Sequence, residues 1–162
     1  YTNTKIEAEN INQFNLNELV SKVISVCDPE KKVDWELNNL NHELYTYEAV
    51  LRLIILNLIV NAIKYNDKET TIISVNFEES SEFYRFNIKD NGKGISKEDI
   101  DKIFNPLENL GAKDKYNQKG TGLGLSYVKK MTEKLGGEIS VDSKLGIGSK
   151  FTFSIKKSQI SD

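Results

Sequence analysis

Residues 53–65 read Leu-Ile-Ile-Leu-Asn-Leu-Ile-Val-Asn-Ala-Ile-Lys-Tyr, and this stretch decides how the rest of the chain must pack. Its apolar side chains cover most of the surface of a helix predicted over residues 46–65, so the helix must be buried on more than one side. Asn57, Asn61 and Lys64 follow one another at i, i+4 and i+7. This spacing places them on one narrow polar stripe of the helix, with Tyr65 at its edge.

The polar stripe (Asn57, Asn61 and Lys64) needs partners. Burying an amide without a hydrogen bond costs about 1–3 kcal/mol, so two asparagines in an apolar helix require a ligand, a metal or internal partners. One interpretation is a pair of satisfied core amides with a lysine that reaches solvent at the helix end. The other is a binding site, and the stripe alone leaves both open.

Around this helix, apolar periodicity and turn residues predict the remaining elements. In chain order they are a helix over 16–24, a strand over 33–37, the helix over 46–65, strands over 71–77 and 83–90, a short helix after Ser96, a helix over 125–135 and strands near 139–141 and 151–155. The order predicts an α/β two-layer sandwich, with helices on one face of a mixed, mostly antiparallel sheet. We expect a linker at 1–14, one domain over 15–157 and a tail at 158–162.

Composition excludes several classes of partner. The 22 basic and 24 acidic residues are mixed along the chain and give a net charge of −2, so neither nucleic acid nor a membrane surface is an expected partner. The longest apolar run, Leu53 to Val60, is broken by Asn57 and is far shorter than the roughly 18 residues of a membrane span. Cys27 is the single cysteine, which fits a reducing compartment and predicts a cytoplasmic location.

All ten glycines lie after residue 91, and several fall in two short stretches, 90–95 and 120–125. Asp90 continues the inward phase of Tyr84, Phe86 and Ile88, so its carboxylate should point inward and needs a donor. An adenine amino group would supply one. The alternative is a simple turn, because Asp-Asn-Gly is a common turn sequence.

The second stretch, Gly120 to Leu125, precedes a predicted helix. Free backbone N–H groups and the helix dipole meet there, and glycines admit close approach, so the stretch predicts an anion site. It is neither a P-loop nor a dinucleotide fingerprint. The polar stretch between Phe104 and Gly120 has no sustained periodicity and is interpreted as a lid.

Together these segments resemble the nucleotide-binding domain shared by sensor histidine kinases, type II topoisomerases, ATP-driven chaperones and mismatch-repair ATPases, which has a Bergerat-type fold. The resemblance spans roughly residues 14–156. The matching segments are residues 57–65 (asparagine box), 90–95 (first glycine box), 104–106 (phenylalanine box) and 120–125 (second glycine box). The chain is most similar to the catalytic, ATP-binding domain of bacterial sensor histidine kinases.

The resemblance implies a role for each matching residue. Asn61 would coordinate Mg²⁺, Asp90 would accept from adenine, and Asn57, Asn61 and Lys64 would form the catalytic group. The implied nucleotide-binding set is Asn57, Asn61, Lys64, Tyr65, Asp90, Gly92, Gly94, Ile95, Phe104, Lys119, Gly120, Thr121, Gly122, Leu123, Gly124 and Leu125. The family's lid arginine is absent, and Lys113, Lys115 or Lys119 would replace it.

Asn57 separates the branches of this superfamily. Members that hydrolyse ATP or phosphorylate serine carry a glutamate four residues before the metal-binding asparagine, whereas an amide is no useful base near neutral pH. The resemblance therefore implies transfer of the ATP γ-phosphoryl group to a histidine. The alternatives are an ATPase or serine-kinase switch and a catalytically silent docking module.

The single histidine, His42, is interpreted as a surface or strand histidine and not as the phosphate acceptor. The acceptor would lie in a preceding dimerisation domain, and a response regulator would be an indirect partner. The expected location is then the cytoplasm, either as a free protein or as the cytosolic part of a membrane-anchored sensor.

Overall fold

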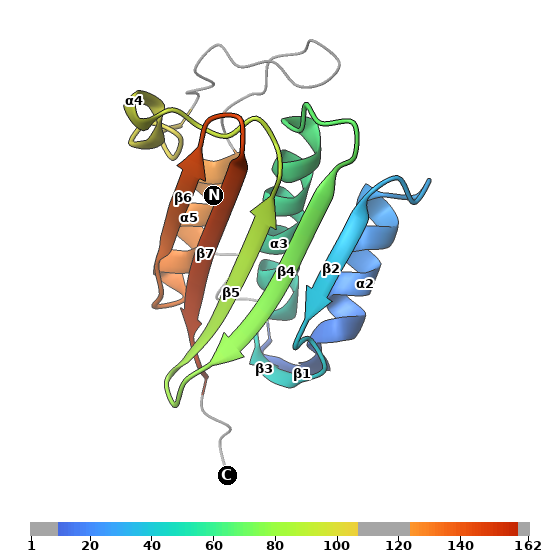
Figure 1. Ribbon diagram of the computed structural model, residues 1–162. Coiled ribbons are helices and arrows are strands. Elements are labelled where there is room, and N and C mark those ends of the chain that lie inside the picture. The colour runs from blue at the N-terminus through green and yellow to red at the C-terminus, as the bar shows by residue number, and fades with distance from the viewer. Residues whose placement is uncertain (1–9, 107–123, 159–162) are drawn as a thin grey trace.

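The computed structural model describes residues 10–106 and 124–158, which form one sheet layer and one helix layer (Figure 1). The sheet has five strands in the order β2-β4-β5-β7-β6. Their bounds are Asp34–Asn38 (β2), Ile72–Glu79 (β4), Phe83–Asp90 (β5), Gly148–Lys156 (β7) and Ile139–Lys144 (β6). Only β2 and β4 are parallel, so the prediction of a mixed, mostly antiparallel sheet is confirmed.

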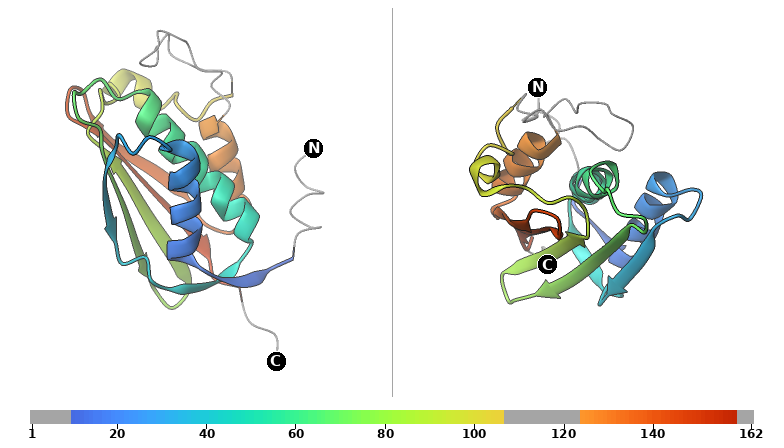
Figure 2. Two further views of the ribbon diagram at one scale, coloured as in Figure 1. Left: turned by 90° about the vertical axis from the view of Figure 1, so that its right-hand side faces the viewer. Right: turned by 45° about the horizontal axis from the view of Figure 1, so that its top comes forward.

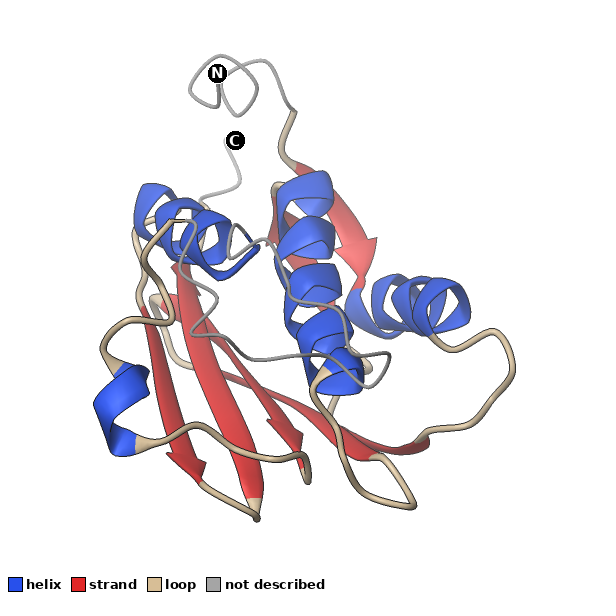
Figure 3. Ribbon diagram, turned by 90° about the horizontal axis from the view of Figure 1, so that it is seen from above, coloured by secondary structure: helices blue, strands red, loops and turns tan. Residues whose placement is uncertain are grey.

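Three helices cover one face of this sheet, while its other face is open (Figure 2, left). They are α2 (Leu16–Cys27), α3 (Glu48–Lys64) and α5 (Gly124–Lys134). Seen from above, α3 lies between α2 and α5 (Figure 3). The short α4 (Lys97–Ile100) follows β5 and begins at Ser96, whose hydroxyl accepts from the Asp99 N–H at 3.2 Å.

The central helix α3 is buried against the sheet and against both neighbouring helices, as its composition predicts. Its buried residues are Val50, Leu51, Ile54, Ile55, Leu58, Ile59 and Ala62. Leu53 of α3 is 43% exposed, which is consistent with burial on more than one side but not all round.

The hairpin of β4 and β5 supplies the sheet side of the core. Its alternating residues Ile73, Val75 and Phe77, and Tyr84, Phe86 and Ile88 on the partner strand, are buried as expected. The Phe86 ring stacks on Phe153 of β7 with 4.6 Å between ring centroids. The period-two pattern therefore predicted correctly which face of this hairpin is buried.

Helix α2 begins and helix α5 ends at the residues where capping signals in the sequence predict. The Asn15 side chain caps α2 by accepting from the Glu18 N–H at 3.1 Å. At the end of α5, Gly136 has a φ of 78°, and Gly136 and Gly137 donate to the carbonyls of Glu133 and Thr132. This is a Schellman motif, which needs a residue that tolerates left-handed backbone, and glycine does so without strain.

A second, two-stranded sheet was not predicted in full. β1 (Asn12–Asn15) pairs antiparallel with β3 (Glu43–Thr46), and Phe14 of β1 is buried in the core. β1 therefore extends the folded region slightly ahead of residue 15, where we expected the domain to begin. His42 precedes β3, with Nε2 2.9 Å from Asn39 Oδ1 and its ring 5.1 Å from that of Phe77.

Candidate nucleotide-binding site

Four segments that are distant in sequence meet at one end of the sandwich. The C-terminal end of α3, the end of β5, the start of α5 and the turn between β6 and β7 all lie at the top of Figure 1. The polar stripe and the first glycine box are therefore at the same end of the molecule. The fold brings together the groups that the sequence placed on separate elements.

The polar stripe touches the start of α5 through Asn57. The Asn57 amide nitrogen donates to the Leu53 carbonyl one turn earlier, at 2.8 Å. Its oxygen faces Gly124, where a Cβ atom would lie only 3.0 Å away. The last glycine of the second glycine box thus packs directly on the stripe, and the donor group of Asn57 is satisfied within its own helix.

Asn61 and Lys64 differ from Asn57 in having no such partner. Among residues 10–106 and 124–158, neither side chain makes a hydrogen bond or an ion pair. Asn61 is half-buried and Lys64 is exposed. An amide oxygen and an ammonium group are therefore available for a ligand at this end of α3.

Asp90 ends β5 with its carboxylate turned inward. Oδ1 accepts from the Gly92 N–H at 2.8 Å, which closes a small Asx turn, and the Ser149 N–H also donates to the carboxylate. Burial raises the pKa of Asp90, while these two N–H groups and the charge of Lys68 oppose the rise. The turn alternative and the inward acid therefore occur together, and the carboxylate keeps acceptor capacity for a further donor.

The first glycine box is closely packed against its neighbours. A Cβ atom on Gly92 would lie 2.9 Å from Asp90 Oδ1 and 3.0 Å from the Tyr65 carbonyl oxygen. Gly94 has a φ of 74°, and a Cβ atom there would lie 2.2 Å from the Lys144 carbonyl oxygen. Glycine is required at both positions for the box to approach α3 on one side and the β6–β7 turn on the other.

The structure adds site residues that sequence reasoning missed. Gly148 at the start of β7 has a φ of 141°, and a Cβ atom there would lie 2.0 Å from the Asp90 carbonyl oxygen. The Ser143 hydroxyl of β6 accepts from the Ile95 N–H at 2.8 Å. The only sequence signal was a glycine next to a strand start, and its contact with Asp90 depends on strand pairing between β5 and β7.

Other residues of the predicted site lie at the same end of the sandwich. The Tyr65 carbonyl accepts from the Lys93 N–H at 3.3 Å, which places Tyr65 beside the first glycine box. The Phe104 ring packs edge-on against Phe151 at 6.4 Å, and Lys129 Nζ lies 5.9 Å from the Phe104 ring centroid. Leu125 of α5 is half-buried against the core.

Several expected positions lie outside the described residues. They are Lys119, Gly120, Thr121, Gly122 and Leu123 of the predicted site, together with Lys113 and Lys115. Across residues 10–106 and 124–158, no three His, Cys, Asp or Glu side chains gather into a metal site. Within the same ranges, no helix is long and apolar enough to cross a membrane.

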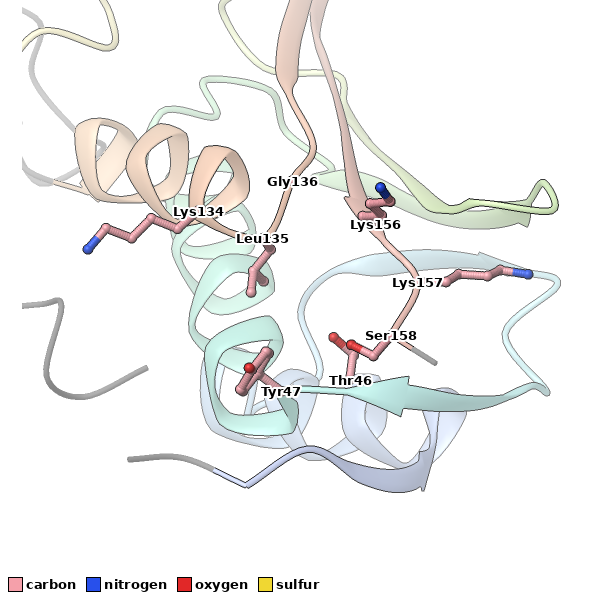
Figure 4. Close-up of a pocket in the computed structure, with 8 residues that line it drawn as sticks. All are labelled: Thr46, Tyr47, Lys134, Leu135, Gly136, Lys156, Lys157 and Ser158. Carbon is pink, nitrogen blue, oxygen red and sulfur yellow. The ribbon is translucent and has the colours of Figure 1, made fainter. Parts of the chain in front are cut away.

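A pocket of about 300 Å³ opens at the opposite end of the sandwich (Figure 4). Its lining residues are Thr46, Tyr47, Lys134, Leu135, Gly136, Lys156, Lys157 and Ser158. The side chains of Lys134 and Lys157 extend away from it in Figure 4, and Lys157 pairs with Glu79 at 2.8 Å. None of the predicted site residues lines this pocket, so it is separate from the candidate site.

An inward carboxylate beside a glycine turn and a helix with a polar stripe thus lie at one end of a sandwich of helices on a mixed sheet. The family model of histidine kinase-, DNA gyrase B- and HSP90-like ATPases matches residues 46–159. The chain therefore belongs to this family of ATPases. Its resemblance to sensor histidine kinase catalytic domains is confirmed by the relatives and structures that it matches.

Two curated relatives illustrate the match. Cyanobacterial phytochrome B of a Nostoc species is 33% identical over 146 residues, covering 88% of this chain and 19% of that protein. The aerobic respiration control sensor protein ArcB of Escherichia coli is 33% identical over 126 residues, covering 76% of this chain and 16% of ArcB. The chain thus spans less than a fifth of the length of these relatives.

Solved structures of histidine kinases also match this chain. The catalytic domain of histidine kinase ThkA is 27% identical with a TM-score of 0.76, over 91% of this chain and 98% of that one. The Acinetobacter baumannii histidine kinase AdeS is 25% identical with a TM-score of 0.74, over 93% of this chain and 69% of that one. This chain is accordingly an ATP-binding catalytic domain of the sensor histidine kinase type.

Proposed function

We propose that this domain binds ATP with Mg²⁺ and transfers the γ-phosphoryl group to a histidine on a separate dimerisation domain. The observation that carries the proposal is the amide of Asn57 at the position where a catalytic carboxylate would stand. Its Nδ2 group is bound to the Leu53 carbonyl, so the side chain presents an oxygen and no basic nitrogen. Such a site can orient a nucleophile but cannot take its proton.

The described residues fit a metal ion that is shared with the nucleotide. Asn61 offers a hard amide oxygen that is unbonded within residues 10–106 and 124–158. Mg²⁺ commonly keeps several waters and takes further oxygens from substrate phosphates, so a single protein ligand is compatible with it. When bound, the ion would neutralise phosphate charge, and Lys64 would add a positive charge beside it.

The base would be held at the other side of the site. Asp90 would accept from the adenine amino group, next to Gly92 and Gly94, while Tyr65 would flank the ring. The inward carboxylate supports this assignment because burial penalises an ion that lacks donors. A base that donates one hydrogen bond would offset part of this cost.

The transfer step needs positioning more than acid or base catalysis. An imidazole nitrogen attacks the γ-phosphorus with its lone pair as the bond to the β-phosphate oxygen breaks, and ADP leaves with that electron pair. Neutral imidazole already offers the lone pair, so the absence of a base at Asn57 is no obstacle. The oxygen of water or serine is a weaker nucleophile that must lose its proton as it attacks, so near neutral pH it needs a base.

The remaining assignments belong to the same proposal. The acceptor would lie on a dimerisation domain of the same protein, a response regulator would receive the phosphoryl group from it, and the location would be cytoplasmic. The proposed boundaries are a linker that ends before β1, in place of the expected 1–14, a domain that ends at residue 157, as expected, and a tail over 158–162.

The test is phosphotransfer in vitro. The domain is mixed with Mg²⁺, γ-labelled ATP and the histidine-bearing domain of the same protein, and we expect acid-labile, base-stable label on the acceptor. Asn61→Ala should give no label. Steady phosphate release without transfer would favour the ATPase alternative, acid-stable label would favour serine phosphorylation, and absence of ATP binding would favour a docking module.

A further inference from the structure

A buried amide, Asn66, and a half-buried one, Asn91, join the loop after α3 to the first glycine box. Asn66 Nδ2 donates to Asn91 Oδ1 at 2.7 Å, and only 5% of the Asn66 surface is exposed. Asn66 follows Tyr65 of the asparagine box, and Asn91 follows Asp90. The two residues, called here the amide pair, therefore connect the C-terminal end of α3, the helix that carries Asn61, to the first glycine box.

The surrounding hydrogen bonds fix which way each amide points. Asn66 Oδ1 accepts from the Lys68 N–H at 2.9 Å, so its nitrogen must face Asn91. Asn91 Oδ1 also accepts from the Ile72 N–H at 2.9 Å, while its nitrogen donates to the Thr70 carbonyl at 2.9 Å. Each of these hydrogen bonds joins a donor to an acceptor. An aspartate at either position would replace the amide nitrogen, which donates, with an oxygen, which cannot.

The same two segments are also joined by weaker links. The Lys68 ammonium donates to the Gly92 carbonyl at 3.1 Å, and the Lys93 N–H donates to the Tyr65 carbonyl at 3.3 Å. The amide pair has shorter bonds and is more buried than these links. Buried and fully satisfied side-chain networks rigidify the elements that they connect.

The first glycine box has independent support on its other side. The Gly146 N–H donates to the Lys93 carbonyl at 2.9 Å, and the Ile95 N–H donates to Ser143 Oγ at 2.8 Å. Breaking the amide pair would therefore leave the box attached to the β6–β7 turn. What would change is its placement relative to the end of α3.

We propose that the amide pair is a positioning element that sets the spacing between Asp90 on the adenine side and Asn61 on the phosphate side. The proposal rests on the proposed function. A ligand that contacts both sides depends on this spacing, whereas a ligand that contacts the adenine side alone does not. Loss of the pair should therefore weaken Mg-ADP binding more than adenosine binding.

The test compares Asn66→Asp, Asn66→Ala and Asn91→Ala, each of which removes the donor or the acceptor of the amide pair, with the unaltered domain. It uses calorimetric titration with Mg-ADP and competition titration with adenosine. We expect each variant to lose at least about 5-fold in Mg-ADP affinity and less than about 2-fold in adenosine affinity. Asn66→Ala and Asn91→Ala would break the same hydrogen bond. The double variant Asn66→Ala/Asn91→Ala should therefore lose no more Mg-ADP affinity than the weaker-binding of the two single alanine variants.

Asn87→Asp is the matched control. Asn87 lies on the same strand as Asp90 and its Oδ1 accepts from Thr152 Oγ1 at 2.8 Å, away from the site. It should keep both affinities, and thermal melts without ligand identify any variant that fails to fold. Equal losses for both ligands, unchanged Mg-ADP affinity or additive losses would overturn the positioning role. If the unaltered domain bound no Mg-ADP, the proposed function itself would fail.

Discussion

The adenine side and the phosphate side of the candidate site are built in different ways. The first glycine box is held by hydrogen bonds from Asp90, Asn91, Lys93 and Ile95 to three neighbouring segments. In the polar stripe of α3, by contrast, the side chain of Asn57 is hydrogen-bonded, and those of Asn61 and Lys64 have no partner within residues 10–106 and 124–158. In the proposed site, a glycine box that is held in place by its neighbours thus accompanies groups whose bonding capacity is left for a ligand.

The two sides differ in whether their polar groups bind the protein itself or are available to a ligand. A rigid pocket binds a flat base without ordering the protein further, which lowers the entropic cost of binding. Free groups on a helix can follow a metal ion and a phosphate chain, which change between ATP and ADP. Substitutions on the adenine side should therefore affect folding as well as binding, whereas those on the phosphate side should affect binding alone.

The largest expected effect is on the adenine side, at Gly148. Gly148→Ala would place a methyl group against the Asp90 carbonyl and also strain a backbone with a φ of 141°. We expect a loss of about 2–5 kcal/mol in the free energy of unfolding, measured by urea titration. Gly146→Ala is the control, since a Cβ atom there meets nothing within 4 Å, and it should lose only about 1 kcal/mol.

Asn61→Ala should separate binding from folding on the phosphate side. We expect Mg-dependent ATP affinity to fall at least about 100-fold, or roughly 3 kcal/mol, because the amide oxygen proposed as the metal ligand is lost. The melting temperature without ligand should stay within about 2 °C, since no described hydrogen bond is broken. Calorimetric titration that gave unaltered affinity would contradict the assignment of Asn61.

Asp90→Asn should weaken adenine binding by roughly 10- to 100-fold, because the ionised acceptor is replaced by a neutral amide. The substitution also removes a carboxylate that is costly to bury, so the stability of the ligand-free domain at pH 7 should not fall. Adenosine titration and thermal melts on the same samples check both parts. A variant that lost stability and kept its affinity would reverse this interpretation.

The raised pKa of Asp90 gives a prediction for pH. A folded pKa above the ordinary value of 3.8 means that the acid form is favoured by folding. As pH falls through the folded pKa, the unaltered domain should gain stability relative to Asp90→Asn and lose affinity for adenosine. Urea titration and adenosine binding between pH 7 and pH 4 should therefore move in opposite directions, and parallel curves for the two proteins would contradict the prediction.

The smallest effect is expected far from both sides. Gly136→Ala would strain the left-handed end of α5 and press on Lys156, whose Cβ lies 3.1 Å from the added atom. We expect a loss of about 1 kcal/mol in unfolding free energy and no change in Mg-ADP affinity. A change in affinity would show that the two ends of the sandwich are coupled.

Much of the fold could be predicted because its signals are local. Alternation in residues 72–79 and 83–90 predicts a hairpin with one buried face, and Asn15 and Gly136 mark helix ends through their own backbone chemistry. β1 and β3 could not be predicted in the same way. They are four residues each, and their pairing joins segments about thirty residues apart.

The candidate site likewise has features that could be predicted from the sequence and features that could not. Asn57, Asn61 and Lys64 share a stripe because helical spacing alone puts them there, and Asp90 points inward because strand alternation does. The contact of Gly124 with Asn57, the fit of Gly148 against Asp90 and the bond between Asn66 and Asn91 could not be predicted. Each joins two segments whose separation depends on how the whole sandwich packs.

The sequence by itself determined the elements of the main sheet and its helices, the polar stripe, the inward acid and the absence of a carboxylate at Asn57, since all of these depend on residue identity and short-range periodicity. Only the tertiary structure decided which groups are already bonded and which are free. Hydrogen bonds between distant segments form after packing sets their distance to within a few tenths of an ångström, and no local pattern encodes that distance.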